Sequence, residues 1–175
     1  MQNILEILKY TVPSIIVFLT ASVMIRYYFK SFVRDRDRDL ILQDRKKTLP
    51  MRLQAYERLA LFLERITVDS LVVREQSDEF TARDFHQHLL AVIRAEYEHN
   101  LSQQIYVSGD AWNVIRNAKE GTLKMLNRAA MQVNPDGPAL DLSKKILEIQ
   151  MEVESSPTQA ALEFLRNEAR QLLER

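Results

Sequence analysis

The chain has 175 residues, with 24 basic and 24 acidic side chains, and 46% of its residues are hydrophobic. This length fits one ordinary domain with an appendage. The chain contains no cysteine, which excludes disulfides, thiolate metal sites and cysteine nucleophiles. Its three glycines, Gly109, Gly121 and Gly137, lie too far apart to form a phosphate-binding loop.

Residues 10 to 25 form a run without charged side chains and rich in aliphatic residues. As a helix this run is about 24 Å long, somewhat shorter than a hydrocarbon core of about 30 Å. Flanking basic side chains can reach outward, and tyrosines favour the membrane interface. We therefore predict a transmembrane helix over residues 3 to 28, with Pro13 near its first turn. Its interface residues are Lys9, Tyr10, Arg26, Tyr27 and Tyr28.

A cleaved signal peptide and a buried core helix are the two other interpretations of this run. A signal peptide carries positive charge before its apolar segment and ends at small residues. Here the order is reversed, because residues 26 to 47 hold eight basic and four acidic side chains. The length of the run and its aromatic flanks favour a membrane span over a core helix. The basic excess after the span predicts an outside N-terminus and a cytoplasmic remainder.

Residues 29 to 48 are predicted to continue the helix as a charged stalk. Between Arg34 and Asp39, opposite charges recur three residues apart, and each such pair adds roughly a few tenths of a kcal/mol to a helix. A patch for anionic lipids is the alternative. The interleaved aspartates dilute its charge and favour a solvated spacer.

The remaining residues, 49 to 175, are predicted to form a cytoplasmic bundle of about five helices. Apolar side chains recur at helical spacing after expected starts at Pro50, Thr81, Ser108, Asp141 or Ser143, and Ser156. The second of these helices is expected to run on through Ile105. The run 71–73 can be a loop or a final helical turn, and 134–138 is a turn. No alternating strand pattern of useful length occurs, so the sequence predicts an all-α protein with an anchor over 1–28 and a stalk over 29–48.

The charge balance and the histidines argue against two classes of ligand. From residue 48 onward there are 15 basic and 19 acidic side chains, whereas nucleic-acid binding depends on basic contacts to phosphate. Glu96 and His99 form one Glu-x-x-His motif, but di-metal bundles need two such motifs and two further carboxylates. His86 and His88 are two residues apart and diverge on a helix. We expect no nucleic acid, metal or cofactor.

One stripe of the predicted helix is more polar than its apolar neighbours require. It is a candidate interaction face, and the alternative is an ordinary solvated side. Its residues are Glu96, His99, Asn100, Gln103 and Gln104. Aromatic residues at helical spacing are either interface anchors or core residues. These are Tyr56, Tyr97, Tyr106 and Trp112.

Two stretches of the chain carry a resemblance to a known family. The first runs from Leu49 to Leu59 as Leu-Pro-Met-Arg-Leu-Gln-Ala-Tyr-Glu-Arg-Leu and continues with 62–66, and the second covers 96–108 and 117–120. With these sequence stretches the chain resembles, over nearly its whole length, a family of small, uncharacterised, single-pass bacterial membrane proteins. The resemblance implies a bacterial inner membrane location. It implies no activity, cofactor or catalytic residue.

Three functions are therefore considered. The first is a non-enzymatic, membrane-tethered helical module that presents its cytoplasmic domain to a protein partner or to a second copy. The second is an accessory subunit of a larger inner-membrane complex. Its span has no glycine, so close helix contacts would rely on Thr11, Ser14, Thr20 or Ser22. The third is an enzyme that uses Glu96 and His99 as acid and base.

Overall fold

The computed structural model describes the backbone of residues 2–153 and 156–174, and their side chains except those of residues 2–12, 14 and 29–47. The chain divides into two units, Met1–Thr48 and Leu49–Arg175. The regular elements among the described residues are helices, and one isolated bridge joins Thr81 and Pro138. The prediction of an all-α protein is therefore confirmed.

Helix α1, Gln2–Arg65, supplies residues to both units. The predicted helix start at Pro50 is wrong, because α1 continues through that residue without interruption. Pro13 also lies about three turns inside the helix, not in its first turn. Each proline removes one backbone hydrogen bond. Because helix formation is cooperative, the intact turns on both sides keep the backbone helical.

In the first unit, the side chains of residues 15–21 and 23–28 are exposed around α1. Among the residues that the structure describes, no helix combines the length and the apolar character needed to cross a membrane. The predicted span begins at residue 3, so residues 3–12 and Ser14 lie outside the described side chains. The same is true of stalk residues 29–47.

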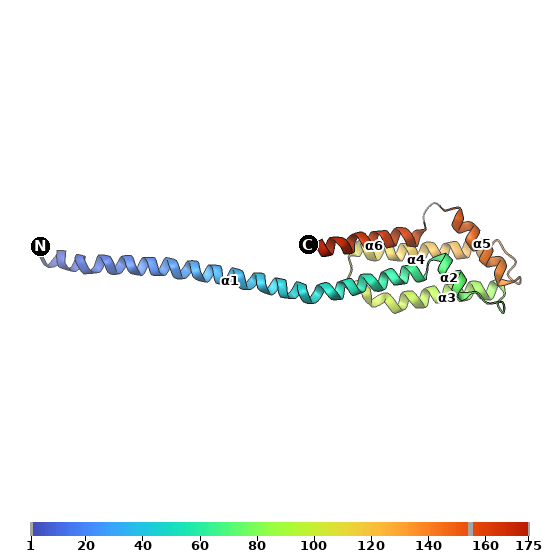
Figure 1. Ribbon diagram of the computed structural model, residues 1–175, viewed down its shortest axis with the longest axis horizontal. Helices are drawn as coiled ribbons and strands as arrows, with labels where there is room; N and C mark the ends of the chain where they lie inside the picture. The colour runs from blue at the N-terminus through green and yellow to red at the C-terminus, as the bar shows by residue number, and fades with distance from the viewer. Residues whose placement is uncertain (1, 154–155, 175) are drawn as a thin grey trace. The chain divides into compact units, whose positions relative to one another are not determined.

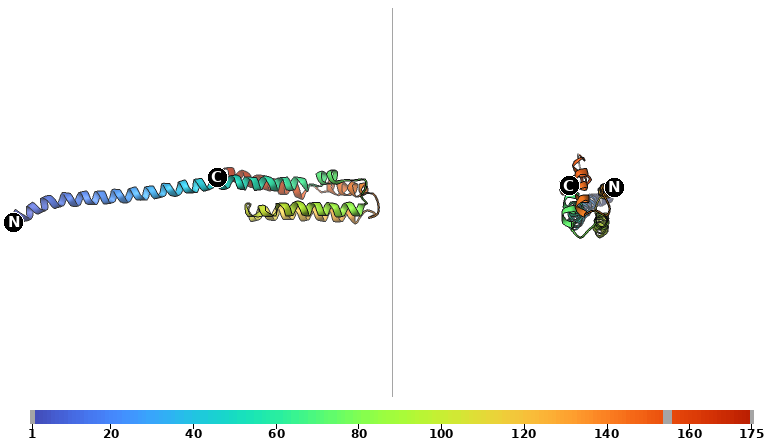
Figure 2. Two further views of the ribbon diagram at one scale, coloured as in Figure 1. Left: turned by 90° about the horizontal axis from the view of Figure 1, so that it is seen from below. Right: turned by 90° about the vertical axis from the view of Figure 1, so that its right-hand side faces the viewer.

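The second unit is a bundle of four antiparallel helices. The part of α1 from Leu49 onward packs with α3, Ala82–Asn100, α4, Gly109–Ala130, and α6, Pro157–Glu174. Neighbouring helices run in opposite directions, with α1 and α6 in one layer and α3 and α4 in the other (Figures 1 and 2). Helices α2, Val68–Glu75, and α5, Ala139–Met151, cover one end, while the short 3₁₀ helix η1, Leu101–Ile105, links α3 to α4 at the other end.

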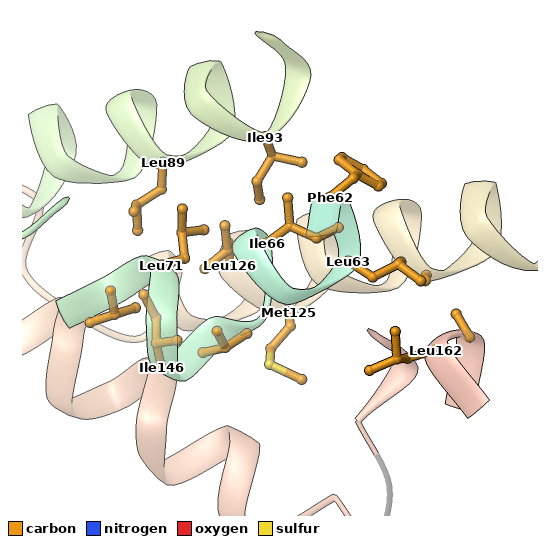
Figure 3. Close-up of a cluster of buried hydrophobic side chains, with 14 of the residues drawn as sticks. Phe62, Leu63, Ile66, Leu71, Leu89, Ile93, Met125, Leu126, Ile146 and Leu162 are labelled. Carbon is orange, nitrogen blue, oxygen red and sulfur yellow. The ribbon is translucent and has the colours of Figure 1, made fainter. Parts of the chain in front are cut away.

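Every α-helix of the second unit contributes apolar side chains to one shared core (Figure 3). Full burial of an aliphatic or aromatic side chain stabilises the fold by about 1.5–3 kcal/mol relative to exposure. The helices are therefore held mainly by their apolar faces. Central members of the core are Phe62, Leu63, Ile66, Leu71, Leu89, Ile93, Met125, Leu126, Ile146 and Leu162.

Two predicted helix caps are confirmed, and one is wrong. The Thr81 hydroxyl accepts a hydrogen bond from the Asp84 amide, and the Ser108 hydroxyl accepts one from the Ala111 amide. Helix α5 instead starts directly after Pro138 without a side-chain cap. Ser143 lies inside it and donates to the Ala139 carbonyl.

The start of α5 is fixed by tertiary contacts with the beginning of α3. The Ala82 amide donates to the Gly137 carbonyl at 2.8 Å, and the Ala139 amide donates to the Phe80 carbonyl at 3.2 Å. These bonds hold the predicted turn over residues 134–138 and bring it against α3. A cap search along the sequence cannot find them, because their partners are more than 50 residues apart.

The remaining boundaries also differ from the expected ones. The ambiguous run 71–73 lies within α2, where Leu71 and Val72 are buried. Helix α3 ends at Asn100, and the chain tightens into η1 through Ile105 instead of continuing as an α-helix. The tighter turn brings the chain round to the start of α4. The predicted helix start at Ser156 is confirmed by α6, which begins at Pro157.

Gly121 lies where α4 approaches the first residue of α6. A Cβ atom on Gly121 would lie 3.1 Å from Pro157 Cγ, whereas a Cβ on Gly109 would meet no atom within 4 Å. Overpacking a closed contact destabilises a protein by about 1–3 kcal/mol. We expect Gly121→Val to lower the free energy of unfolding by that amount, and the matched Gly109→Val to change it by less than about 1 kcal/mol. Urea titration followed by circular dichroism measures both, and equal midpoints for the two variants would contradict the close contact.

A polar cluster ties α2 to α3 beside the core. Glu75 accepts hydrogen bonds from Arg74 Nε at 2.7 Å and from His88 Nε2 at 2.8 Å, and the Phe80 ring lies 5.3 Å from the His88 ring. Burial by itself raises the pKa of the Glu75 carboxyl, but the two donors and their charges outweigh it and lower the pKa below its ordinary value of 4.5. The ionised carboxylate is therefore favoured in the folded protein.

The lowered pKa makes this contribution depend on pH. It is present above the pKa of the unfolded chain and is lost as the pH falls through the lower pKa of the folded state. At pH 7 we expect Glu75→Gln to destabilise the protein by about 1 kcal/mol, a modest value because the pair lies near solvent. Urea midpoints at pH 7 and at pH 3 test this, with the exposed Glu98→Gln as control. A difference that persists unchanged at pH 3 would show that the carboxylate charge plays no part.

Candidate functional site

A cleft of about 600 Å³ opens at the end of the bundle where η1 leads into α4. Its walls come from the Leu49–Arg65 part of α1, the start of α4 and the last turns of α6. The lining mixes charged, amide and apolar groups, as binding pockets for small molecules do. The lining residues are Arg52, Ser108, Asp110, Phe164, Asn167, Glu168, Gln171 and Leu172.

Ser108 and Glu168 join two walls of this cleft. The Ser108 hydroxyl caps α4 by accepting from the Ala111 amide at 3.0 Å, and it donates to Glu168 Oε2 at 3.0 Å. This places the Glu168 carboxylate beside the N-terminus of α4, where the helix dipole favours negative charge. The bond between α6 and the start of α4 therefore fixes the shape of the cleft.

Tyr56 lies beside the same residues, from the α1 side. Its residue surface is 4% exposed, and its hydroxyl has no hydrogen-bond partner of standard geometry among the described residues. Burial, then the proximity of the Glu168 carboxylate, raises the pKa of Tyr56 to about 12, although Arg52 and the Ser108 backbone act in the opposite direction. Glu168 is thus close enough to influence the hydroxyl without bonding to it in good geometry. At neutral pH the buried Tyr56 hydroxyl is therefore neutral and lies near the Glu168 carboxylate.

Arg52 supplies the positive charge of the cleft. Its Nε donates to the Tyr106 carbonyl at 3.1 Å, which ties α1 to the end of η1. In the described part of the chain, Arg52 forms no ion pair with Asp110 or Glu168, although all three line the same cleft. The cleft therefore presents separated charges of opposite sign.

The predicted polar stripe lies outside this cleft. Glu96 pairs with Arg65 of α1 at 3.0 Å, and Asn100 is buried and donates to the Glu96 carbonyl at 2.8 Å. His99 and Gln104 are exposed, and Gln103 is half-buried. Within the stripe, Glu96 thus links α3 to α1, and the Asn100 side chain bonds within α3. Its role as an interaction face stays a prediction.

Two of the predicted aromatic anchors, Tyr97 and Trp112, pack against each other. Tyr97 stacks on Trp112 with ring centroids 5.5 Å apart, and Lys119 Nζ lies 4.2 Å above the Tyr97 ring. These side chains pack between α3 and α4 next to the core, so they act as packing residues. Of the predicted membrane-interface residues, Lys9 and Tyr10 lie outside the described side chains, and the others, Arg26, Tyr27 and Tyr28, are exposed.

The histidines take part in hydrogen bonds at the other end of the bundle. His86 Nε2 lies 2.9 Å from Asn127 Oδ1, and His88 donates to Glu75. Among the described side chains, no three His, Asp or Glu residues gather closely enough to hold a metal ion. Glu96 and His99 do not share a described pocket.

Some residues of the cleft could be recognised from local sequence patterns. Ser108 and Asp110 are recognisable as a helix start, and Tyr56 belongs to an apolar stripe. Arg52 and Glu168, however, lie on the polar faces of amphipathic helices, where the sequence predicts ordinary solvent-exposed side chains. Glu168 is 60 residues away from Ser108 in the sequence. Local sequence patterns carry no information about such a distant contact.

Comparison with known proteins places the chain in a family. Residues 2–172 match a family of unknown function (DUF7935), and the chain belongs to this family. No curated protein matches the chain, and no solved structure does. The match agrees with the expected membership of an uncharacterised family and covers both units.

The unpartnered hydroxyl of Tyr56 makes a sharp prediction about stability. A buried polar group without a hydrogen bond costs about 1–3 kcal/mol, so removing it is favourable when the ring remains. We expect Tyr56→Phe to raise the free energy of unfolding by about 1 kcal/mol at pH 7, and Tyr97→Phe to leave it nearly unchanged.

Alkaline pH should widen the difference between Tyr56→Phe and the parent protein. A raised pKa means that folding loses stability as the pH rises from 10.0, the ordinary tyrosine value, to about 12. The phenylalanine variant has no such ionisation. Urea midpoints at pH 7 and pH 10.5 provide the measurement, and a destabilised Tyr56→Phe would mean that the hydroxyl is already well bonded.

Proposed function

We propose that this protein is a membrane-tethered helical module. Residues 3–28 anchor it in the inner membrane of a bacterium with the N-terminus outside. The bundle faces the cytoplasm and is presented, with its cleft, to a protein partner or to a second copy of the chain. The proposal is for a binding module without catalytic activity of its own.

The observation that carries this proposal is the apolar surface of α1 in the first unit. Ten large apolar or aromatic side chains between residues 15 and 28 are each 56–78% exposed. A helix that is apolar on all sides needs a cover, either protein or lipid. These side chains are Ile15, Ile16, Val17, Phe18, Leu19, Val23, Met24, Ile25, Tyr27 and Tyr28.

The polar groups within this run are compatible with lipid as the cover. The Thr20 hydroxyl donates to the Ile16 and Val17 carbonyls, each at 2.9 Å. A hydroxyl satisfied by its own helix does not require water or a partner helix in the hydrocarbon. The accessory-subunit alternative would use Thr20 for contacts with a neighbouring helix. The Thr20 hydroxyl is already bonded within α1, so it gives that alternative no specific support. The charge asymmetry of the flanks supports the orientation.

The bundle supports the interaction part of the proposal. It has its own core, with buried side chains from every α-helix of the second unit. It can therefore keep its surface in a fixed form while the anchor holds it near other membrane proteins. Such tethering raises the effective concentration of the module without any new contact.

Membrane fractionation tests the anchor. We expect the full chain to sediment with membranes and to resist alkaline carbonate extraction. Val17→Arg combined with Met24→Arg should release it, because each arginine in the span opposes insertion by about 2.5–3.5 kcal/mol. The control pair Val73→Arg and Met131→Arg replaces equally exposed apolar residues of the bundle and should stay in the membrane fraction. Recovery of the parent chain in the soluble fraction would contradict the proposed membrane anchor.

The same membranes test presentation to a partner. After gentle solubilisation and crosslinking, the chain should migrate as a complex with a second copy or with another protein. Replacing residues 3–28 by an unrelated apolar helix should preserve that complex. Loss of the complex in this chimera would favour the accessory subunit, and a solitary monomer in all samples would contradict both.

A further inference from the structure

We propose that Asp136 is a modification site, at which the link between Asp136 and Gly137 rearranges to isoaspartate when the turn over residues 134–138 opens. The rearrangement is spontaneous and uses only groups of this chain and water. It concerns the second unit alone and does not depend on the membrane anchor. The inference rests on the exposed Asp-Gly pair, on the bonds that restrain it, and on the contact between this turn and α3.

The chemistry of this pair favours an intramolecular ring closure. The Gly137 backbone nitrogen attacks Cγ of Asp136, a C–N bond forms, and the protonated carboxyl group loses its hydroxyl together with the amide proton as water. Water then opens the resulting succinimide at either carbonyl, which restores aspartate or leaves isoaspartate. Glycine has no Cβ to hinder the attack. The Asp136 side chain is 77% exposed, so water has access to the ring.

The fold engages both reacting groups in other bonds. The Gly137 amide donates to the Asn134 carbonyl at 3.0 Å, so its proton is held within the turn. The Asp136 carboxylate lies 3.1 Å from the Arg83 guanidinium of α3, which favours the ionised and unreactive form. The Asp136 amide also donates to Asn134 Oδ1 at 3.2 Å. Attack on Cγ therefore requires that the turn first loses these bonds.

The turn also carries bonds that join it to α3, and isoaspartate disturbs them. The Arg83 amide donates to the Pro135 carbonyl at 2.9 Å, and the Ala82 amide donates to the Gly137 carbonyl at 2.8 Å. Isoaspartate routes the backbone through Cβ and Cγ of residue 136 and so lengthens it by one carbon atom. The two carbonyls lie on opposite sides of the inserted atom, so both bonds cannot keep their geometry. The modification therefore weakens the junction between α3 and the start of α5.

Incubation of the full chain in heavy-oxygen water, in detergent micelles at pH 7, tests the proposal. Each passage through the succinimide adds one heavy oxygen to residue 136, and mass spectrometry of the tryptic peptide 129–144 measures this label and the isoaspartate fraction. Labelling of the folded chain should be at least about tenfold slower than in guanidinium chloride, because the reaction follows the population of the opened turn. Equal rates would overturn the restraint by the fold. An unlabelled residue 136 in the unfolded chain would overturn the site.

Three variants assign the groups that take part. Asp136→Glu keeps a carboxylate for Arg83 but requires a larger ring, so residue 136 should take up no label; undiminished labelling would exclude the succinimide route. Arg83→Gln removes the ion pair and should speed labelling by about two- to fivefold, the range for an exposed pair. Arg94→Gln makes the same charge change at an exposed position of α3 and should label like the parent. Equal rates in the two arginine variants would contradict the role of the ion pair.

The stability of the modified chain tests the consequence for the fold. The isoaspartate form can be separated from aged samples by chromatography. In urea titrations followed by circular dichroism, it should unfold at a lower urea concentration than the unmodified chain from the same sample. An unchanged midpoint would contradict the weakened junction between α3 and α5.

Discussion

The second unit depends on the burial of one apolar face from each of its helices in a single core. Leu63 from α1, Leu89 from α3, Leu126 from α4 and Ile146 from α5 are all fully buried. Helices of about one to two dozen residues are only marginally stable in water by intrinsic propensity, so each helix of the unit needs the others. Packing four helices antiparallel satisfies this need, and the connections between them contain α2 and α5. The positions of all polar groups at the bundle ends follow from that arrangement.

The cleft is a consequence of where the bundle core stops. At the end formed by η1 and the start of α4, the helices offer backbone donors and polar side chains instead of apolar faces. The Ser108–Glu168 hydrogen bond closes one side of this end, and the bond from Arg52 to the Tyr106 carbonyl closes another. Tyr56 lies between the two, with its ring in the core and its hydroxyl at the polar boundary. The first unit shows the reverse situation, since its apolar side chains are exposed.

Local patterns were informative where one stretch of chain contains the whole cause. The caps at Thr81 and Ser108, the turn over 134–138 and the start of α6 at Pro157 all follow from neighbouring residues. The predictions failed at Pro50, which interrupts no helix, and at α5, whose start is set by backbone bonds to residues near Thr81. In the candidate site, Tyr56 and Ser108 could be singled out from sequence, but their relation to Arg52 and Glu168 could not.

Residue spacing within single segments was sufficient to predict the helical class, the apolar run near the N-terminus and the residues that form each amphipathic face. Which polar residues meet depends instead on how the helices pack. Arg52, Tyr56, Ser108 and Glu168 come from three helices and become neighbours only when the apolar faces pack in one particular order. Helical periodicity tells which side of a helix is polar. Periodicity does not tell which other helix will bring its polar face next to that surface.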